Sequence, residues 1–384
     1  MDRAHQTEIV TKLFAHMAAG TTDVMPAEMH HPVSAYVDPA QAAAEREALF
    51  KRLPLIACHA TEIPKPNDFL TTDLAGVPVL IVRQTDGALK AFTNVCRHRG
   101  SKVETAERGS KKLFVCPFHA WSYDGEGALR NMPFAEGFCG MDRKKRGLTA
   151  LPVEERHGLV WVVPTAGGKI DVAAHLGARL DAELAAWGLS TTVYERHQTF
   201  DIPINWKLVV DGFMEDYHLT VLHKNTIGPY FAANLHTFDA FGRHGRMIAA
   251  RANFTKLANK APEAVDLLRC SAPVYSLFPC AVLVWQNDHF ELWTIMPDRH
   301  DPLRSHVTAR LLAPSAEEAV SHKPLWDKNW TILMDTVEKE DWIASKDIQN
   351  GIAGGGQTHF VFGRNEPALQ HFHQQITAAV TRSV

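Results

Sequence analysis

Two short cysteine–histidine pairs constrain this 384-residue chain more than any other feature of its sequence. Cys96 and His98 form a C-x-H pair, and after seventeen residues Cys116 and His119 form a C-x-x-H pair. Each pair follows a short apolar run that is typical of a strand. Because a strand fixes the position of the loop at its end, two such loops can bring four ligands to one inorganic centre. The sequence therefore predicts a β-rich module built around a metal site.

Two thiolates and two imidazoles fit two kinds of centre. One is tetrahedral zinc, and the other is a Rieske [2Fe–2S] cluster, in which two histidines hold one iron and two cysteines the other. Zinc modules more often repeat a C-x-x-C or H-x₃₋₅-H spacing, whereas the unequal halves found here are typical of a Rieske cluster. The spacing favours [2Fe–2S]. Zinc and a set of ordinary buried cysteines and histidines remain the alternatives.

Short strands separated by turn residues predict an all-β domain over residues 53–164. Asp86-Gly87, between the apolar runs 77–83 and 88–95, is a hairpin signal. Two further turns are indicated at Asp124-Gly125 and His157-Gly158.

Residues 1–52 and 165–384 mix helical periodicity with strands and predict a second, α+β domain. Asn205 is expected to cap a helix that continues through His218. The other expected elements are helices at 6–19, 39–52, 172–187, 315–346 and 367–380, and strands at 199–203, 281–286, 289–296 and 304–312.

A second group of metal-ligating residue types lies in this α+β region. His218 and His223 would point about 140° apart on an ideal helix, so they can share a metal only if the helix ends or loosens between them. Glu340 and Asp341 lie on a predicted helix, and one carboxylate would complete a 2-His-1-carboxylate site for Fe(II). Taken alone, these residues are equally well explained as one core histidine, one surface histidine and a solvated acidic face.

The stretches 94–100 and 116–121 resemble the Rieske domain of the Rieske non-haem iron oxygenases, the ring-hydroxylating oxygenase alpha-subunit family. Residues 205–223 resemble the iron-binding helix of that family, and residues 340–351 resemble the helix that supplies its third iron ligand. The resemblance implies an α+β protein: an all-β Rieske [2Fe–2S] domain over 53–164 and a helix-grip (START-like) α+β catalytic domain.

The resemblance also implies roles for individual residues. A [2Fe–2S] cluster would be held by Cys96, His98, Cys116 and His119, and a mononuclear Fe(II) by His218, His223 and Asp341, with Glu340 as the alternative carboxylate. Glu215, three residues before His218, would link that histidine to a Rieske histidine of a neighbouring subunit. Asp216 is the alternative bridge, but it lies about 100° further round a helix, so we favour Glu215.

The activity implied by the resemblance is hydroxylation of an organic substrate with O₂. No G-x-G-x-x-G motif is present, so electrons from NAD(P)H are expected to arrive through a separate reductase or ferredoxin. A homotrimer is expected, because a neighbour's cluster would then lie near each iron. The alternatives are an O- or N-demethylase of the same family, and a Rieske electron-transfer protein with a non-catalytic ligand-binding domain.

The substrate is expected to be hydrophobic and aromatic, because apolar and aromatic residues dominate the regions from which a pocket could form. Segment 225–280, which matches the family least, is where we expect substrate choice to reside. The candidate pocket residues are Phe213, Leu219, Phe231, Leu235, Val284 and Phe290.

The composition limits the kinds of binding partner and the cellular compartment that we expect for this chain. The formal net charge of −3 gives no support for binding nucleic acid or a membrane surface through bulk charge. Six cysteines in a chain of this length argue against a disulfide scaffold and for a reducing compartment. The N-terminal residues lack the apolar core of a secretory signal, so we expect a cytoplasmic protein.

Overall fold

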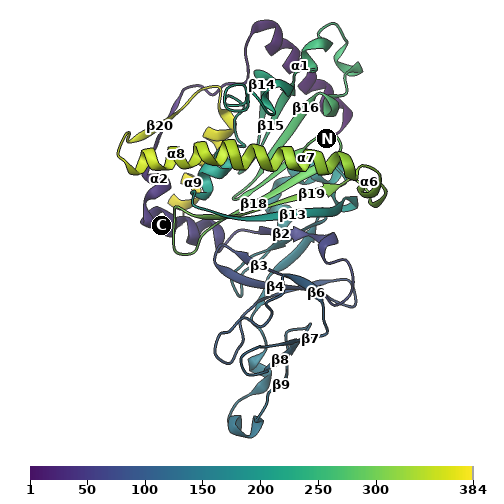
Figure 1. Cartoon of the computed structure of the whole chain (residues 1–384), viewed down its shortest axis with the longest axis vertical. Coiled ribbons are helices and arrows are strands. Elements are labelled where there is room, and N and C mark those ends of the chain that lie inside the picture. The colour runs from purple at the N-terminus through teal and green to yellow at the C-terminus, as the bar shows by residue number, and fades with distance from the viewer. Residues whose placement is uncertain (383–384) are drawn as a thin grey trace. The chain divides into compact units, whose positions relative to one another are not determined.

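The structure, a computed structural model, describes residues 1–382 and forms two compact units (Figure 1). One unit comprises Met1–Arg46 together with the chain from Leu176 onward, and the other comprises Glu47–His175. These bounds are slightly wider than the span 53–164 predicted for the β-rich domain, and the assignment of a function to each domain stays a prediction. The predicted combination of an all-β region with an α+β region is confirmed.

The unit Glu47–His175 consists mainly of short antiparallel strands. A five-stranded sheet has the order β10-β5-β4-β3-β6, and two three-stranded sheets have the orders β11-β12-β2 and β7-β8-β9. The predicted hairpin at Asp86-Gly87 is present between β4 and β5. The strands are β2 (Leu55–His59), β3 (Asp68–Leu74), β4 (Val77–Arg83), β5 (Leu89–Thr93), β6 (Arg108–Ser110), β7 (Leu113–Val115), β8 (Ser122–Asp124), β9 (Leu129–Asn131), β10 (Ala150–Leu151), β11 (Val153–Arg156) and β12 (Leu159–Val162).

The other unit is organised around a seven-stranded antiparallel sheet with the order β13-β19-β18-β17-β16-β15-β14. The predicted hairpin at residues 281–296 forms its β17–β18 pair. A separate pair joins β1 (Met29–Pro32) to β20 (His359–Phe362). The strands of the large sheet are β13 (Val193–Ile202), β14 (Phe231–Phe241), β15 (His244–Arg251), β16 (Ser271–Leu277), β17 (Ala281–Trp285), β18 (Phe290–Pro297) and β19 (Ser305–Ala313).

Helices cover this sheet, and α7 and α8 run across it almost end to end (Figure 1). A π-helical turn at Val337–Asp341 joins α7 to α8, so the helical stretch predicted at 315–346 is confirmed as a series of segments. Helix α1 packs against β14, and α9 packs against β14 and β15. The helices are α1 (Arg3–Ala19), α2 (Ser34–Val37), α3 (Pro39–Glu45), α4 (Val172–Ala186), α5 (Trp206–Asp211), α6 (Ala316–Ser321), α7 (Lys323–Thr336), α8 (Trp342–Ala353) and α9 (Pro367–Thr381).

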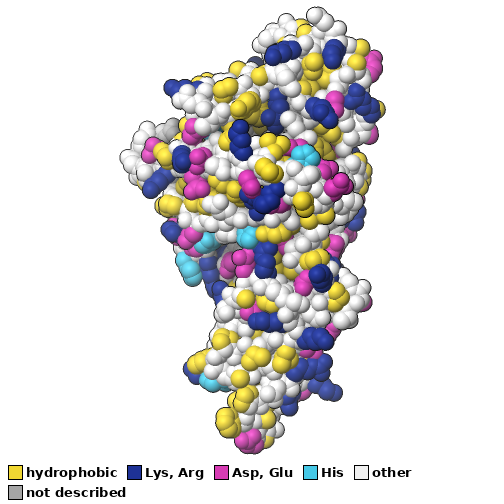
Figure 2. All heavy atoms as spheres, turned by 45° about the vertical axis from the view of Figure 1, so that its right-hand side comes forward, with side chains coloured by type: hydrophobic (Ala, Val, Ile, Leu, Met, Phe, Trp, Pro, Cys, Tyr) yellow, Lys and Arg dark blue, Asp and Glu magenta, His cyan; other side chains and the backbone are white. Residues whose placement is uncertain are grey.

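The described surface carries mixed charge. Figure 2 shows acidic and basic side chains interspersed over the visible face, as the small net charge of −3 leads one to expect. No helix among residues 1–382 is long and apolar enough to cross a membrane.

Helix α5 is fixed at its first residues by a buried polar network. Asn205 caps the helix by accepting a hydrogen bond from the Lys207 N–H (2.8 Å), as predicted. Its own N–H donates to the side-chain oxygen of Gln349 on α8 (2.8 Å), and its side-chain amide donates to the Tyr36 carbonyl (2.7 Å). The cap therefore joins segments that lie far apart in the sequence.

Lys207 forms a buried ion pair next to this cap. Its Nζ lies 2.7 and 2.9 Å from the two carboxylate oxygens of Glu45, and both side chains are nearly inaccessible to solvent. The Trp206 indole also donates to Glu45 (3.2 Å). Burial lowers the pKa of Lys207, and the charge of Glu45 opposes this effect. Each charge therefore depends on the other for its place in the core.

We expect Glu45→Gln to destabilise the unit that contains α5 by about 3 kcal/mol, because it leaves the Lys207 ammonium buried without a counter-ion. The double variant Glu45→Gln/Lys207→Met should regain most of this loss. Denaturant unfolding of each variant measures the effect. Glu47→Gln, which removes an exposed pair with Lys51, is the control and should cost under about 1 kcal/mol. An equal loss in both single variants would contradict the role of the buried pair.

Candidate metal centres and active-site cavity

The first cysteine–histidine loop is a tight turn after β5. The Cys96 N–H donates to the Ser101 carbonyl (2.8 Å), and the Gly100 N–H donates to the Cys96 carbonyl (3.0 Å). Gly100 has a φ of 82°, a left-handed conformation that costs glycine little. The Asn94 side chain braces this turn by accepting the N–H groups of Val103 (3.1 Å) and Glu104 (3.0 Å).

The second loop repeats the same backbone pattern after β7. The Cys116 N–H donates to the Trp121 carbonyl (2.8 Å), and the Ala120 N–H donates to the Cys116 carbonyl (3.0 Å). Ala120 takes the left-handed position with a φ of 57°. Two loops with the same hydrogen-bonding geometry thus present the two ligand pairs.

The four side chains come together with the thiols inside and the imidazoles outside. Cys96 and Cys116 are buried in the core of the unit, whereas His98 is half-buried and His119 is exposed. The two imidazole centroids lie 4.6 Å apart. The His98 Nδ1 is buried without a hydrogen-bond partner in residues 1–382. Burial raises the pKa of Cys96, and the facing Cys116 thiol raises it further.

This donor set fits a [2Fe–2S] cluster. An unpartnered ring nitrogen and two facing buried thiols would each be satisfied by a metal bond. Tyr123 adds support, because its hydroxyl accepts the Arg97 N–H (3.0 Å) and can donate its proton to Cys96 Sγ (3.4 Å). Trp121 stacks on His98, with centroids 4.8 Å apart and an interplanar angle of 11°. Tyr123 thus contacts a cysteine ligand and Trp121 a histidine ligand, and such contacts fix the direction in which each ligand points.

The second candidate centre lies in the chain after α5. The helix predicted to continue through His218 ends at Asp211, so that prediction was wrong. The Glu215 carboxylate accepts the backbone N–H groups of Tyr217 (2.5 Å) and His218 (3.1 Å), which a continuous helix would have used internally. As the spacing requires if they are to share a metal, His218 and His223 lie on irregular turns.

Gly228 closes the loop that carries these two histidines. Its N–H donates to the His223 carbonyl (2.9 Å). A Cβ at this position would lie 2.3 Å from the Leu219 carbonyl oxygen and 2.8 Å from that of His223. The backbone can therefore fold back this closely only at a glycine.

Three side chains from distant parts of the sequence meet here. The Asp341 carboxylate lies 3.1 Å from His223 Nε2 and 3.7 Å from His218 Nε2. One ligand atom from each of the three residues falls within 4.8 Å of the others. This is the 2-His-1-carboxylate arrangement that suits non-haem Fe(II).

The adjacent carboxylates of Glu340 and Asp341 contact the two ring nitrogens of His223. Glu340 accepts from His223 Nδ1 (2.6 Å) and from the Thr226 hydroxyl (2.7 Å), while Asp341 faces the opposite ring nitrogen of His223. Both carboxylates belong to the π-helical turn Val337–Asp341, a type of irregularity frequent at functional sites. Asp341 therefore lies where a metal ligand is predicted, and Glu340 lies where it would orient His223.

Each histidine is oriented through its Nδ1, which turns its Nε2 toward Asp341, where a shared metal would bind. Glu215 forms a short contact with His218 Nδ1, as Glu340 does with His223. Although burial lowers the pKa of His218, the hydrogen bond and charge of Glu215 raise it overall. Asp341 and Glu340 do the same for His223 against burial. A cation that takes the place of these protons would fit the donor set.

Asp216, the alternative bridge, faces away from His218. Its carboxylate lies 2.9 Å from His236 Nδ1 on β14, and both side chains are buried. The structure therefore brings Glu215, and not Asp216, to the first histidine.

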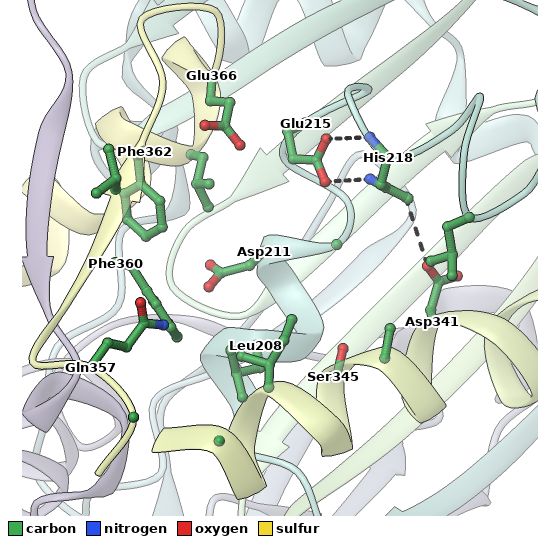
Figure 3. Close-up of a pocket in the computed structure, with 18 residues that line it drawn as sticks. Leu208, Asp211, Glu215, His218, Asp341, Ser345, Gln357, Phe360, Phe362 and Glu366 are labelled. Carbon is green, nitrogen blue, oxygen red and sulfur yellow. Dashed lines mark hydrogen bonds and ion pairs between the residues drawn. The ribbon is translucent and has the colours of Figure 1, made fainter. Parts of the chain in front are cut away.

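His218 and Asp341 open onto a cavity of about 790 Å³ (Figure 3). Helix α5 and the turn after it form part of the wall, and α8, the segment 356–362 and the start of α9 form the rest. His223 is buried behind the lining. The lining residues are Leu208, Asp211, Gly212, Glu215, His218, Leu222, Asp341, Ala344, Ser345, Ile348, Gly351, Gly356, Gln357, Phe360, Val361, Phe362, Glu366 and Leu369.

The residues predicted to shape the pocket lie elsewhere among the described residues. Leu235 belongs to a core cluster under α1, and Phe290 packs between Trp187 and Trp285. Phe213 packs on Trp293. None of the six predicted residues (Phe213, Leu219, Phe231, Leu235, Val284 and Phe290) lines this cavity, and neither does any part of 225–280. Apolar residues of strands fill the sheet core, and sequence periodicity does not distinguish core from pocket.

Sequence reasoning identified Glu215, His218 and Asp341 among the lining residues and missed the others, of which Asp211, Phe360, Phe362 and Glu366 matter most for the chemistry of the cavity. Asp211 ends a short helix whose other residues are buried, which is an available signal for a polar group pointed at a cavity. The segment that carries Phe360 and Phe362 follows a glycine-rich stretch and has no helical periodicity, so the sequence contained no comparable signal for it.

Two family profiles match the chain. The family described as "Ring hydroxylating alpha subunit (catalytic domain)" matches residues 189–382, and the "Rieske [2Fe-2S] domain" matches residues 54–149. The first match includes both histidines and the carboxylates of the second centre, and the second includes both cysteine–histidine loops.

Among curated proteins, the chain is 36% identical over 179 residues to a benzene 1,2-dioxygenase subunit alpha of Pseudomonas putida, which covers 45% of this chain and 40% of that protein. It is 31% identical over 194 residues to the carnitine monooxygenase oxygenase subunit of Acinetobacter baumannii, which covers 47% of this chain and 48% of that protein. The chain thus spans less than half the length of these relatives.

Solved structures share the fold over nearly the whole chain. A quaternary ammonium Rieske monooxygenase in complex with L-carnitine has a TM-score of 0.76 at 20% identity, with 93% of this chain and 96% of that chain covered. Naphthalene 1,2-dioxygenase from Rhodococcus sp. bound to indole has a TM-score of 0.75 at 17% identity, with 98% and 99% covered.

Substitution of the two adjacent carboxylates separates a metal ligand from an orienting residue. We expect Asp341→Ala to lose the iron that the [2Fe–2S] cluster does not account for, because a direct ligand is removed. Glu340→Gln should keep this iron but bind it about 10–100-fold more weakly, because only the orientation of His223 is disturbed. Iron analysis after dialysis against graded chelator measures both. The opposite pattern would make Glu340 the ligand.

Proposed function

The chain belongs to the ring hydroxylating alpha subunit family, and from this we propose that it is the terminal component of a Rieske-type oxygenase. In this role it would use O₂ and electrons from a separate protein to hydroxylate an organic substrate with an apolar body. The observation that carries the proposal is the presence of two complete donor sets in one chain, one for a [2Fe–2S] cluster and one for a lone ferrous ion.

The two groups would supply one-electron transfer and the activation of O₂ when bound. The chain's own residues do the positioning. Cys96, Cys116, His98 and His119 would hold the cluster, and His218, His223 and Asp341 the mononuclear iron. Glu215 and Glu340 keep the protons of the two imidazoles on Nδ1, so that both Nε2 atoms stay available as ligands. The apolar part of the cavity wall would contact the uncharged body of the substrate.

Glu215 is proposed to link the two kinds of centre across a subunit boundary. Its carboxylate already contacts His218 and lines the cavity wall. His119 is exposed, so its ring can reach a neighbouring copy. Inter-subunit electron transfer has been described for a quaternary ammonium Rieske monooxygenase. These features support a ring-shaped homotrimer in which each cluster serves the next subunit's iron.

A ferredoxin or reductase is proposed as the electron donor, with NAD(P)H as the original source. The surface near the cluster loops carries exposed basic residues in the run Arg143–Arg146. Lys145 and Arg146 share a shallow depression with Arg97, which neighbours Cys96. A basic surface of this kind fits an acidic electron-transfer partner and would speed its approach.

Demethylation is the second candidate reaction. The position three residues before His218 is Glu215, and a glutamate there occurs in some monooxygenating members of the family, whereas many ring-dioxygenating members have an aspartate. A relative is a carnitine monooxygenase subunit, and a structural neighbour was solved with L-carnitine. In this version, hydroxylation of a methyl group would be followed by release of formaldehyde.

The holoprotein, supplied with a surrogate reductase and NADH, should convert an apolar substrate only in the presence of O₂. We expect products of a panel of monocyclic aromatics and N-methylated amines to carry ¹⁸O from ¹⁸O₂, as measured by mass spectrometry. Formaldehyde release identifies demethylation. His218→Ala is the control and should lower turnover at least about 1,000-fold, because its substitution removes an iron ligand. A protein that accepts electrons yet forms no product across the panel would instead be the electron-transfer alternative.

Glu215→Gln should slow electron transfer between the two centres about 10–100-fold while iron content is retained, because the charge that orients His218 is lost. Rapid-mixing measurement of cluster reoxidation in a single turnover gives the rate. Glu338→Gln, an exposed residue of the same π-helical turn as Glu340, is the charge-matched control and should react like the wild type. Normal reoxidation in Glu215→Gln would exclude the bridge.

A further inference from the structure

The cavity beside His218 and Asp341 has an unbalanced charge. Asp211, Glu215, Asp341 and Glu366 all contribute carboxylates to its lining, and no lysine or arginine of the described chain lines it. Figure 3 shows the carboxyl groups of Asp211, Glu215 and Glu366 arranged around the same space. A ligand binds in this cavity if the proposed function is right, and these groups determine the charge that the ligand should carry.

Two of the four carboxylates belong to the proposed metal centre. Asp341 faces both candidate iron ligands, and Glu215 contacts His218. A divalent ion at the triad would balance these two negative charges. Asp211 and Glu366 lie outside this centre, so the ion would not balance their charges.

Asp211 is partly compensated by His373 and by the charge of the buried Lys207, which is itself paired with Glu45. One of its oxygens accepts the Tyr36 hydroxyl (2.6 Å), and the other lies 2.8 Å from His373 Nε2. The Tyr36 hydroxyl also lies 3.0 Å from the same ring nitrogen, so the three groups form a closed network behind the cavity wall. This network fixes the direction of the Asp211 carboxylate.

Glu366 has fewer partners. It accepts the backbone N–H of Gly363, and no cationic side chain among residues 1–382 forms an ion pair with it. Burial raises the pKa of Glu366, and the charges of Glu215 and Asp211 raise it further. A positive group in the cavity would relieve this repulsion and stabilise the ionised carboxylate.

The walls near these carboxylates are aromatic. Phe360 and Phe362 line the cavity from β20, and the ring of Phe362 is held by stacking on His31 and His373. Phe360 is held edge to face against Tyr36, with centroids 5.1 Å apart. Aromatic faces next to a carboxylate attract alkylammonium groups through cation–π and charge interactions. The apolar side chains of Leu208, Ile348 and Leu369 would contact the uncharged part of such a ligand.

We propose that the substrate of the oxygenase inferred above is an organic cation, with an apolar body near the metal triad and a quaternary or protonated amine between Glu366, Asp211 and the rings of Phe360 and Phe362. The cavity volume of about 790 Å³ lies within the range of small-molecule sites. Glu366 is then the specificity-determining residue, because it is the carboxylate with the least compensation.

Binding of two probes of the same shape tests this inference without turnover. Phenyltrimethylammonium and tert-butylbenzene differ in one atom and in charge. Equilibrium dialysis against the full-length holoprotein measures the dissociation constant of each. We expect the ammonium probe to bind about tenfold more tightly than the neutral one. Equal binding, or tighter binding of tert-butylbenzene, would overturn the inference and indicate a pocket for neutral hydrocarbons.

The variant Glu366→Gln tests whether Glu366 is the residue that recognises the positive charge of the ligand. The amide oxygen can still accept the Gly363 N–H, so the local turn is preserved. We expect affinity for phenyltrimethylammonium to fall about tenfold and affinity for tert-butylbenzene to change less than about twofold. Asp347→Asn is the matched control, because Asp347 lies exposed on α8 outside the lining and should leave both affinities unchanged. A parallel loss for both probes in Glu366→Gln would refute the role of Glu366.

If Glu366→Gln does not fold, the comparison of the two probes on the wild-type protein still decides the charge of the ligand. The outcome is also separable from that of the proposed function. A protein that oxidises neutral aromatics and does not bind the ammonium probe refutes this inference alone. A protein that binds the ammonium probe selectively but forms no oxygenated product refutes the oxygenase function alone.

Discussion

The candidate iron site depends on one buried polar connection, the cap of α5. Asn205 joins the start of this helix to Gln349 on α8 and to the Tyr36 carbonyl, and the adjacent Lys207–Glu45 pair is sealed in the core. Helix α5 leads into the loop with the two histidines, and α8 follows the turn with the carboxylate. An unpaired buried polar group would destabilise the protein, so this connection fixes the position of α5 relative to α8. Ligands separated by more than a hundred residues can therefore meet within bonding range of a single ion.

Departures from regular helix create the site itself. A continuous helix would have directed His218 and His223 to different sides, so the chain leaves the helix at Asp211 and closes its loop at Gly228. The π-helical turn Val337–Asp341 lets adjacent carboxylates reach both nitrogens of one imidazole. In both places the backbone departs from a regular α-helix, and the departure points the ligand side chains toward one position. The two cysteine–histidine loops instead position their ligands with the same type of turn in each loop. Hydrogen bonds to Asn94 and Tyr123 support the first of these turns.

The distribution of charge distinguishes this cavity from a simple apolar pocket. Around the metal triad, each acidic group has a histidine partner, and across the cavity Asp211 is tied into a network with Tyr36 and His373. Glu366 is left with a backbone donor only. Because its surroundings disfavour the ionised carboxylate of Glu366, a cationic ligand in the cavity would be the group that stabilises this charge. The aromatic walls point to the same kind of ligand, and they are held in place by contacts outside the cavity.

Short sequence motifs were enough to predict much of the fold of this protein. The spacing of Cys96, His98, Cys116 and His119, the hairpin at Asp86-Gly87 and the cap at Asn205 are short-range features, so the sequence alone specified the β-rich unit, the α+β unit and the start of α5. The family resemblance added His218, His223 and Asp341 as a group. Tertiary structure decided where α5 ends, which acidic neighbour faces each histidine, and which residues line the cavity. Strand periodicity reports burial without saying what a side chain is buried against, so the six expected pocket residues lie outside the lining. Phe360 and Glu366 reach the cavity only because distant segments fold together around it.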